Sequence, residues 1–357
     1  MTRRSRRDIL RATAATAVGV GALSAVGAAA FDGSSSKKDI PAHLRGAAPL
    51  PYAEVVSLDL AAGEEARTDA LHAAHRAITA SNKGSTISWL ALGESGLPQG
   101  VSQPRYLKQM PSFAGDVLDA ARSHGDLLLQ ITGPSATAVQ EAAEQALRTL
   151  KQWQVRWRLA GYRPENRTED GRGLSRNPFH FTEGYGNPAS TADAAERALV
   201  KDGPEEPSWA VGGSYQVIRI IRLATDFWDR DTIDAQERII GRRRDGRWLD
   251  GTPTNEQPVF STDPLGKITP LDAHVLRATP NRRKPPPLIR RGYTYQRESS
   301  NRGLLFSCFQ HDLENGFEAV QRRLQGEAMA KYTLTIGDGY HFIPPPGTTR
   351  LETLTST

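Results

Sequence analysis

The residues of this sequence with the most specific chemistry lie between positions 264 and 295, and His274 is the first of them. A neutral imidazole is a good axial ligand for haem iron, and a desolvated arginine can stabilise charge that develops on a bound peroxide. Arg290 supplies such an arginine on the C-terminal side of His274. One histidine followed by one arginine carries little information by itself, since most such pairs are structural, so the flanking patterns decide the interpretation.

Four stretches in the second half of the chain together resemble the haem-binding half of the dye-decolorising peroxidases. In chain order they are residues 179–188, 212–242, 264–295 and 303–342. Each stretch alone is a weak signal, whereas all four in the family's order carry the resemblance. The resemblance implies an enzyme with haem b that reduces hydrogen peroxide and oxidises aromatic, phenolic or dye-like reductants.

The resemblance also assigns roles to single residues. His274 falls on the family's proximal position and would bind the iron. Glu327 would accept the other ring N–H, which makes the imidazole a stronger donor; a solvated glutamate at a helix end is the alternative. Arg290 would lie on the distal side and stabilise the leaving oxygen as the O–O bond breaks. Leu304 and Phe306, two apart on one strand, would wall the distal pocket or belong to the plain core.

The sequence departs from the family at one catalytic signature. Where the family carries Gly-x-x-Asp-Gly, this chain has His180-Phe181-Thr182-Glu183-Gly184. Glu183 keeps a carboxylate that can move a proton between the two peroxide oxygens, but its extra methylene alters the geometry. His180 replaces a glycine and loses the easy access to positive φ that glycine has. Two interpretations of His180 stay open: a distal base, or a surface or second-layer histidine.

The roles of several other residues depend on their exposure. Arg242 is a candidate for pairing with a haem propionate, although the adjacent Arg243 and Arg244 make a solvated basic turn a competing interpretation. Arg291 is expected to face solvent. Electrons from bulky reductants are expected to pass through surface-linked aromatic residues, and the candidates are Tyr293, Tyr295 and Trp248.

The elements that must position these residues follow a ferredoxin-like order twice. In the first half, the hydrophobic patterns predict strands and helices in the order β-α-β-β-α-β. The strands are residues 53–60, 85–92, 126–131 and 154–159, and Ser135 is predicted to cap the second helix. The second half repeats the order loosely, with strands at 213–223 and 303–309, helices at 231–240 and 312–324, and a loop at 162–178 before them.

These elements predict an α+β protein with two ferredoxin-like units, each an antiparallel sheet with helices, and the haem in the second unit. We place the first unit at residues 51–195 and the second at residues 196–357. Residues 31–50 contain Ser, Lys, Pro and Gly and predict a flexible linker. Cys308 is the single cysteine of the chain, so no disulfide framework is expected.

The first thirty residues predict a signal peptide of the twin-arginine export pathway. Arg6 and Arg7 precede an apolar run and the small residues at 28–30 that signal peptidase needs. The run is short for a spanning helix, so we expect a secreted, periplasmic or cell-wall protein without a stable membrane span. Residues 1–30 hold five Arg and one Asp, so their removal lowers the formal net charge from +5 to +1, which argues against a nucleic-acid surface.

Two further hypotheses are open on the sequence. A haem-dependent enzyme with changed peroxide or oxygen chemistry on a dedicated metabolite would account for the altered signature at Glu183. A haem-handling protein of iron uptake would keep the haem site with little turnover. The expected partners of the leading hypothesis are hydrogen peroxide and an aromatic reductant, and a homo-oligomer is left open.

Overall fold

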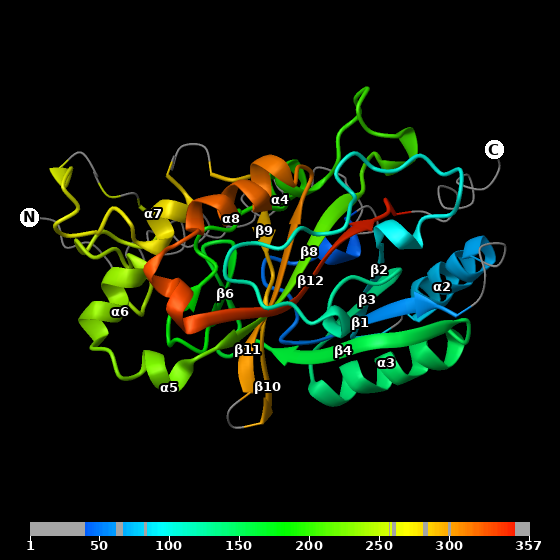
Figure 1. Ribbon diagram of the computed structural model, residues 1–357, viewed down its shortest axis with the longest axis horizontal. Helices are drawn as coiled ribbons and strands as arrows, with labels where there is room; N and C mark the ends of the chain where they lie inside the picture. Colours follow the sequence, from blue (N-terminus) through cyan, green and yellow to red (C-terminus); the bar gives the residue numbers. More distant parts are fainter. Residues whose placement is uncertain are drawn as a thin grey trace, which may run out of the picture. The chain divides into compact units, whose positions relative to one another are not determined.

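The computed structural model describes residues 40–61, 67–81, 84–256, 258, 262–280, 285–298 and 301–346. The predicted signal peptide and residues 31–39 of the predicted linker lie outside the described residues. The rest of the predicted linker is described, and its residues His43 and Leu44 are buried against the fold. From Ala42 onward the described chain forms one compact unit, built on a nine-stranded sheet with helices packed against it (Figure 1). Within the described residues, no helix is long and apolar enough to cross a membrane.

The first half folds into antiparallel strands that pack against two helices. The strands are β1 (Tyr52–Leu60), β2 (Ile87–Leu92), β3 (Leu127–Gly133) and β4 (Trp153–Tyr162), and the helices are α2 (Arg67–Ser81) and α3 (Ala136–Thr149). Their order across the sheet is β4-β1-β3-β2. The predicted cap is present, since the Ser135 hydroxyl accepts a hydrogen bond from the Ala138 N–H at 3.2 Å. Val56 and Leu58 on β1 share one apolar core with both helices.

The second half repeats this arrangement. Its strands are β8 (Ser214–Leu223), β10 (Tyr293–Glu298), β11 (Asn301–Gln310) and β12 (Thr333–Ile343), in the order β12-β8-β11-β10. The helices α5 (Thr225–Trp228), α6 (Ile233–Ile240) and α7 (His274–Ala278) follow β8, and α8 (Ala319–Leu324) precedes β12. The prediction of two ferredoxin-like units is therefore confirmed, although β10 and β12 are not among the predicted strands.

The helix predicted over 312–324 is interrupted. Residues Glu314–Glu318 form a π-turn, and α8 begins only at Ala319. The Gln310 side chain accepts a hydrogen bond from the Phe317 N–H at 3.0 Å, in place of a bond within a regular helix. The remaining short elements are η1 (Ala42–Leu44), η3 (Glu94–Gly96), η4 (Ala120–Arg122), α4 (Thr191–Ala198), η5 (Ser208–Ala210) and η8 (Ala328–Tyr332).

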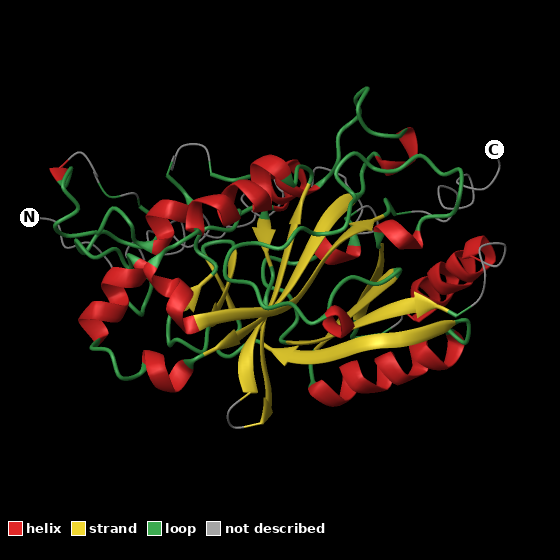
Figure 2. Ribbon diagram, in the orientation of Figure 1, coloured by secondary structure: helices red, strands yellow, loops and turns green. Residues whose placement is uncertain are grey.

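The two halves join edge to edge, so that the strands close into a ring (strands in yellow in Figure 2). β10 pairs with β4 as well as with β11, and β12 pairs with β2. Each joint between the halves is a single residue pair: Thr294 with Tyr162, and Phe342 with Leu92. β9 (Ile289–Arg290) pairs with Cys308 and Phe309 of β11, on the same edge that pairs with β10 nearer the start of β11. Backbone pairing alone therefore holds the halves together only weakly, and side chains must contribute.

Polar side chains cross between the halves and make part of that contribution. Trp89 Nε1 on β2 donates to Gln216 Oε1 on β8 at 3.1 Å. Gln216 Nε2 in turn donates to Gln130 Oε1 on β3 at 2.7 Å. All three side chains are buried, so each hydrogen bond satisfies a group that would otherwise be costly to remove from water.

The segment 162–178, predicted to be a loop, instead contains a β-hairpin. β5 (Arg167–Glu169) pairs with β6 (Arg172–Arg176), which also pairs with β7 (Thr182–Glu183). The turn is Asp170-Gly171, with φ of 47° and 72°. An Asp-Gly pair with positive φ at both positions is typical of a two-residue hairpin turn. The strands around it are mostly polar, so the alternation that usually reveals a strand is missing.

Candidate functional site

His274 and Glu327 meet in the second half. α7 begins at His274, and Glu327 lies directly before η8. His274 Nδ1 is 2.8 Å from Glu327 Oε2, and the two side chains are 26% and 10% exposed. A carboxylate at Nδ1 keeps the proton there, so the lone pair of Nε2 stays available for a metal. Glu327 is thus in contact with His274, as the resemblance implies, and is not a solvated glutamate at a helix end.

Close packing holds the turn that carries His274. Gly241 ends α6 in the left-handed region, at φ 89°. A Cβ at Gly241 would lie 2.6 Å from Val275 Cγ2, so a side chain there would push α7 away. From the other direction, Arg277 Nη1 donates to the Gln325 carbonyl at 2.9 Å. These contacts fix α7 between α6 and the segment that leads to Glu327.

Arg290 lies on β9 against the loop that follows β7. The Asn187 side chain makes two hydrogen bonds to its backbone: Asn187 Nδ2 donates to the Arg290 carbonyl at 2.7 Å, and the Arg290 N–H donates to Asn187 Oδ1 at 2.9 Å. A Cβ on Gly186 would lie 2.5 Å from Arg290 Nη2. The loop therefore needs both residues to approach the arginine. The sequence interpretation missed them, and the Gly-Asn pair close behind the altered signature is the signal that points to them.

Glu183 lies close to Arg290. It ends β7, is half-buried, and accepts a hydrogen bond from the Ser175 hydroxyl at 3.4 Å. Burial lowers the pKa of Arg290, and the negative charge of Glu183 partly offsets that decrease. Arginine begins from so high a pKa that the guanidinium stays charged at neutral pH. The carboxylate and the guanidinium that the sequence interpretation assigned to the distal side thus interact electrostatically.

His180 takes a different position. Its backbone has φ 69°, the left-handed conformation that the family's glycine adopts easily. Its ring Nε2 is 3.2 Å from Asp229 Oδ1, and both side chains are 49% exposed. The pairing with Asp229 directs the ring towards solvent. This placement favours the interpretation of His180 as a surface histidine over that of a distal base.

Leu304 and Phe306 lie on one face of β11, and both are half-buried. Leu304 packs against the apolar cluster around Trp228, and so does Val275, the residue after His274. The Phe306 ring is 6.3 Å from that of Phe317. Leu304 therefore packs beside the turn that carries His274, whereas Phe306 packs against a separate apolar cluster that includes Phe317; both positions are compatible with either predicted role.

Arg242 is half-buried and ordered by aromatic contacts. Its guanidinium carbon lies 3.6 Å from the centre of the Trp248 ring, and Nη1 donates to the Gly246 carbonyl at 2.6 Å. The neighbouring Arg243 is exposed. A solvated turn thus describes Arg243, whereas Arg242 has the fixed orientation that an anion-binding arginine needs.

Two expectations about exposure are wrong. Arg291 does not face solvent: it is 7% exposed and donates hydrogen bonds to the carbonyls of Leu44, Arg45 and Gly46. The three proposed surface-linked aromatic residues are all buried, with Trp248 at 0% and Tyr293 and Tyr295 at 2% exposed. Tyr293 and Tyr295 lie on β10, within the ring of strands, and the Trp248 ring is covered by the Arg242 guanidinium.

The donor set at His274 fits a haem. An imidazole oriented by a carboxylate would hold the iron of a haem, because the macrocycle would supply most of the other ligands. Within the described part of the chain, no three His, Cys, Asp or Glu side chains come together to hold a bare metal ion. Arg242 has the charge and orientation to meet a propionate, and Arg290 has the charge to meet an oxygen anion.

Comparisons with known proteins agree with this site. Residues 60–163 match the family model "Dyp-type peroxidase, N-terminal", and residues 174–348 match "Dyp-type peroxidase, C-terminal". Proteins named deferrochelatase from Shigella flexneri and Escherichia coli strain K12 are each 37% identical to this chain over 254 residues. Each match spans 68% of this chain but 60% of the relative, which is less than two thirds of its length.

Solved structures resemble the whole fold. The DyP-type peroxidase of Cellulomonas bogoriensis has a TM-score of 0.73 at 26% identity, covering 86% of this chain and 94% of that one. Ferric DtpA of Streptomyces lividans has a TM-score of 0.74 at 26% identity, covering 89% and 94%. With both ferredoxin-like halves matched and the His274–Glu327 pair in place, the chain belongs to the Dyp-type peroxidase family.

Proposed function

We propose that this chain is an exported haem b peroxidase that reduces hydrogen peroxide and oxidises aromatic, phenolic or dye-like reductants. The observation that carries the proposal is the hydrogen bond of 2.8 Å between His274 Nδ1 and Glu327 Oε2. A carboxylate at the other ring nitrogen orients a histidine ligand and makes it a stronger donor to iron, which would suit peroxide chemistry at a haem. Membership of the Dyp-type peroxidase family supports the same activity.

When bound, the haem supplies the iron at which peroxide is reduced. The protein's own residues then handle protons and charge. Glu183 would carry a proton from one peroxide oxygen to the other, and Arg290 would stabilise negative charge that develops on the oxygen that leaves as water. Leu304 and Phe306 would exclude water and bulky reductants from the distal side, and Arg242 would hold a propionate.

The proposal is tested by replacing Arg290. Arg290→Leu should lower the rate of peroxide-dependent dye oxidation by about 100- to 1000-fold, because loss of one such charge donor typically costs this much. The Soret absorption should remain, since Arg290 does not bind the iron. Arg243→Leu removes the same charge from an exposed position and should retain the wild-type rate. An Arg290→Leu protein that oxidises dye at the wild-type rate would contradict the role.

Deferrochelatase activity is a second candidate. It is favoured by the relatives of that name at 37% identity, and by the replacement of the family's distal aspartate with Glu183. Incubation of the haem-loaded protein with peroxide and a dye separates the two activities. Peroxidase function predicts dye oxidation with the iron retained, whereas iron release without dye turnover would support the second candidate and haem handling in iron uptake.

We also propose that the protein is exported by the twin-arginine pathway and acts outside the cytoplasm. The support lies in Arg6, Arg7 and the apolar run that follows them. This pathway carries folded proteins, so a haem bound in the cytoplasm would be exported with the chain.

A further inference from the structure

Residues 42–50, close to the start of the described chain, pack into the fold and form what we call the N-terminal strap. Within it, His43 and Leu44 are 1% and 2% exposed. The His43 ring lies 5.0 Å from that of Phe309 on β11 and 6.3 Å from that of Trp89 on β2. The strap therefore contacts strands of both ferredoxin-like halves.

Arg291 binds the N-terminal strap through its guanidinium group. Nη1 donates to the Arg45 carbonyl at 3.0 Å, and Nη2 donates to the carbonyls of Leu44 and Gly46 at 3.2 and 2.6 Å. Carbonyl groups at the end of a helical turn, here η1, are good partners for a cation. Burial lowers the pKa of Arg291 to about 10, so the side chain is charged at neutral pH, and these carbonyls offset the cost of burying it.

The residues after Arg291 are tied to the same region. The Tyr293 hydroxyl donates to the Leu50 carbonyl at 3.1 Å, at the far end of the strap. Arg163 Nη1 donates to the Gly292 carbonyl at 2.7 Å. Residues 291–293 are therefore held by side-chain hydrogen bonds, and the side chains of Arg291 and Tyr293 both bond to the strap.

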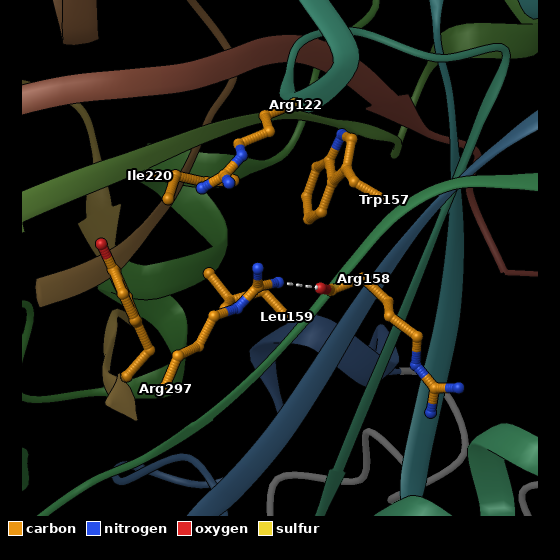
Figure 3. A pocket seen from close by; sticks show the side chains of 7 residues that line it. Arg122, Trp157, Arg158, Leu159, Ile220 and Arg297 are labelled. Atoms are coloured by element: carbon orange, nitrogen blue, oxygen red, sulfur yellow. Dashed lines mark hydrogen bonds between the residues drawn. The ribbon is translucent and has the colours of Figure 1, made fainter. Parts of the chain in front are cut away.

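Arg297 on β10 offers a comparison within the same part of the chain. It is exposed and donates to a single carbonyl, that of Arg158 on β4, at 2.7 Å (Figure 3). Arg291 is 7% exposed and donates to three carbonyls. A guanidinium group removed from water needs several hydrogen bonds to compensate for its burial. The position of Arg291 is therefore fixed more tightly than that of Arg297.

Arg290 depends on the same stretch of backbone. β9 is only two residues long, Ile289–Arg290, and Arg291 follows it directly. Successive residues of an extended chain point in opposite directions, so Arg290 lies against Gly186 on one side while Arg291 reaches the strap on the other. A strand this short has little pairing of its own, so a shift of Arg291 displaces Arg290 as well.

We propose that Arg291 and the N-terminal strap are positioning elements for peroxide reduction, which hold β9 so that the Arg290 guanidinium stays on the distal side. The inference rests on the proposed role of Arg290. It goes beyond that role because it makes the reaction depend on a segment that lies 245 residues before Arg291 at Gly46. A protein whose strap is not docked should still bind haem but should react slowly with peroxide.

The test compares Arg291→Gln with Arg297→Gln in the haem-loaded full-length protein. Both changes remove one charge and a guanidinium that bonds to backbone carbonyls. Stopped-flow mixing should show a rate constant for peroxide that is about 10- to 100-fold lower in Arg291→Gln, because small displacements of a catalytic group are costly. Arg297→Gln should keep the wild-type value, and Arg291→Lys should recover part of the loss. The later reaction with the reductant should be unchanged in all three, which a general loss of structure would not allow.

Hydrogen exchange supplies a measurement that does not depend on activity. Amides of residues 289–292 should exchange faster in Arg291→Gln than in the wild type, because a strand that loses its anchor opens more often. The amides of the strap should exchange faster as well. Arg297→Gln should keep the wild-type protection of both regions.

Gly46→Ala disturbs the strap from its exposed side, so the variant should fold even if changes at buried Arg291 interfere with folding. Gly46 has φ 74°, and a Cβ there would lie 3.1 Å from the Ala48 carbonyl oxygen. Gly100→Ala is the matched control, with φ 82° and nothing within 4 Å of its Cβ. Gly46→Ala should slow the reaction with peroxide and increase exchange at 289–292, whereas Gly100→Ala should do neither.

Wild-type peroxide rates and wild-type exchange at 289–292 in both Arg291→Gln and Gly46→Ala would overturn the inference. A wild-type protein that does not react with peroxide would refute the proposed function instead. The exchange data would then still decide whether the strap holds β9.

Discussion

At the scale of single residues, the structure distinguishes His180 from Glu183, the two candidates for the distal base in the altered signature. His180 keeps the left-handed backbone conformation, at φ 69°, although this conformation costs a histidine about 1 kcal/mol or more. Its ring is directed to Asp229 and solvent. Glu183 instead lies within the electrostatic influence of Arg290. The fold thus preserves the left-handed turn at His180, and Glu183 remains the proposed proton carrier.

Substitutions at Glu183 test this assignment. Glu183→Gln keeps the size of the side chain but cannot carry a proton, so peroxide-dependent oxidation should slow by about 100-fold or more. Glu183→Asp removes the extra methylene and should raise the rate. His180→Ala should leave the rate unchanged. Stopped-flow mixing with peroxide provides the measurement, and a fast Glu183→Gln protein alongside an inactive His180→Ala protein would identify His180 as the base.

At the scale of elements, the loop after β7 positions Arg290 through Asn187. Asn187→Ala removes two hydrogen bonds to the Arg290 backbone and should lower the peroxide-dependent rate by about 10- to 100-fold, because small displacements of a catalytic group are costly. Asn187→Asp keeps the acceptor and loses the donor, so its rate should fall between those of the wild type and Asn187→Ala. Asn315→Ala, on an exposed position, is the control. A wild-type rate in Asn187→Ala would show that β9 holds Arg290 without the loop.

The elements also show what the sequence could and could not predict. The first half was predictable because its signals are local: Ser135 caps α3, and Val56 and Leu58 alternate along β1. Polar strands such as β5 and β6 were missed because nothing in them alternates, although the Asp170-Gly171 turn was a usable signal. The exposure of single side chains was the least predictable feature. Arg291 is buried because its guanidinium donates to the carbonyls of residues 44–46, which are far away in the chain.

At the scale of the whole molecule, buried histidines make stability depend on pH. Burial lowers the pKa of His43 and of His341 to about 3, from an ordinary value of 6.5. Both are neutral in the folded and the unfolded chain above pH 6.5. Below it the unfolded chain binds protons that the folded chain cannot, so stability falls as the pH decreases from 6.5 towards 3. Each histidine contributes on the order of a few kcal/mol to this loss.

His341→Leu should therefore reduce the loss of stability between pH 6.5 and 4, as measured by denaturant midpoints. Asp338 has the opposite effect on the pH dependence of stability. Burial raises its pKa to about 6, so the free energy of unfolding falls as the pH rises from about 3.8 through 6. Asp338→Asn should stabilise the protein above pH 6 and change little below pH 4. An unchanged pH profile in His341→Leu would show that His341 does not limit acid stability.

The most direct test of the whole account is the absorption spectrum of the haem-loaded His274→Ala protein. His274 is the proposed iron ligand, and Glu327 fixes its orientation through a 2.8 Å hydrogen bond. The account predicts a collapsed or shifted Soret band in both the ferric and the ferrous state, while His180→Ala keeps the wild-type spectrum. A His274→Ala spectrum identical to that of the wild type in both oxidation states would contradict it.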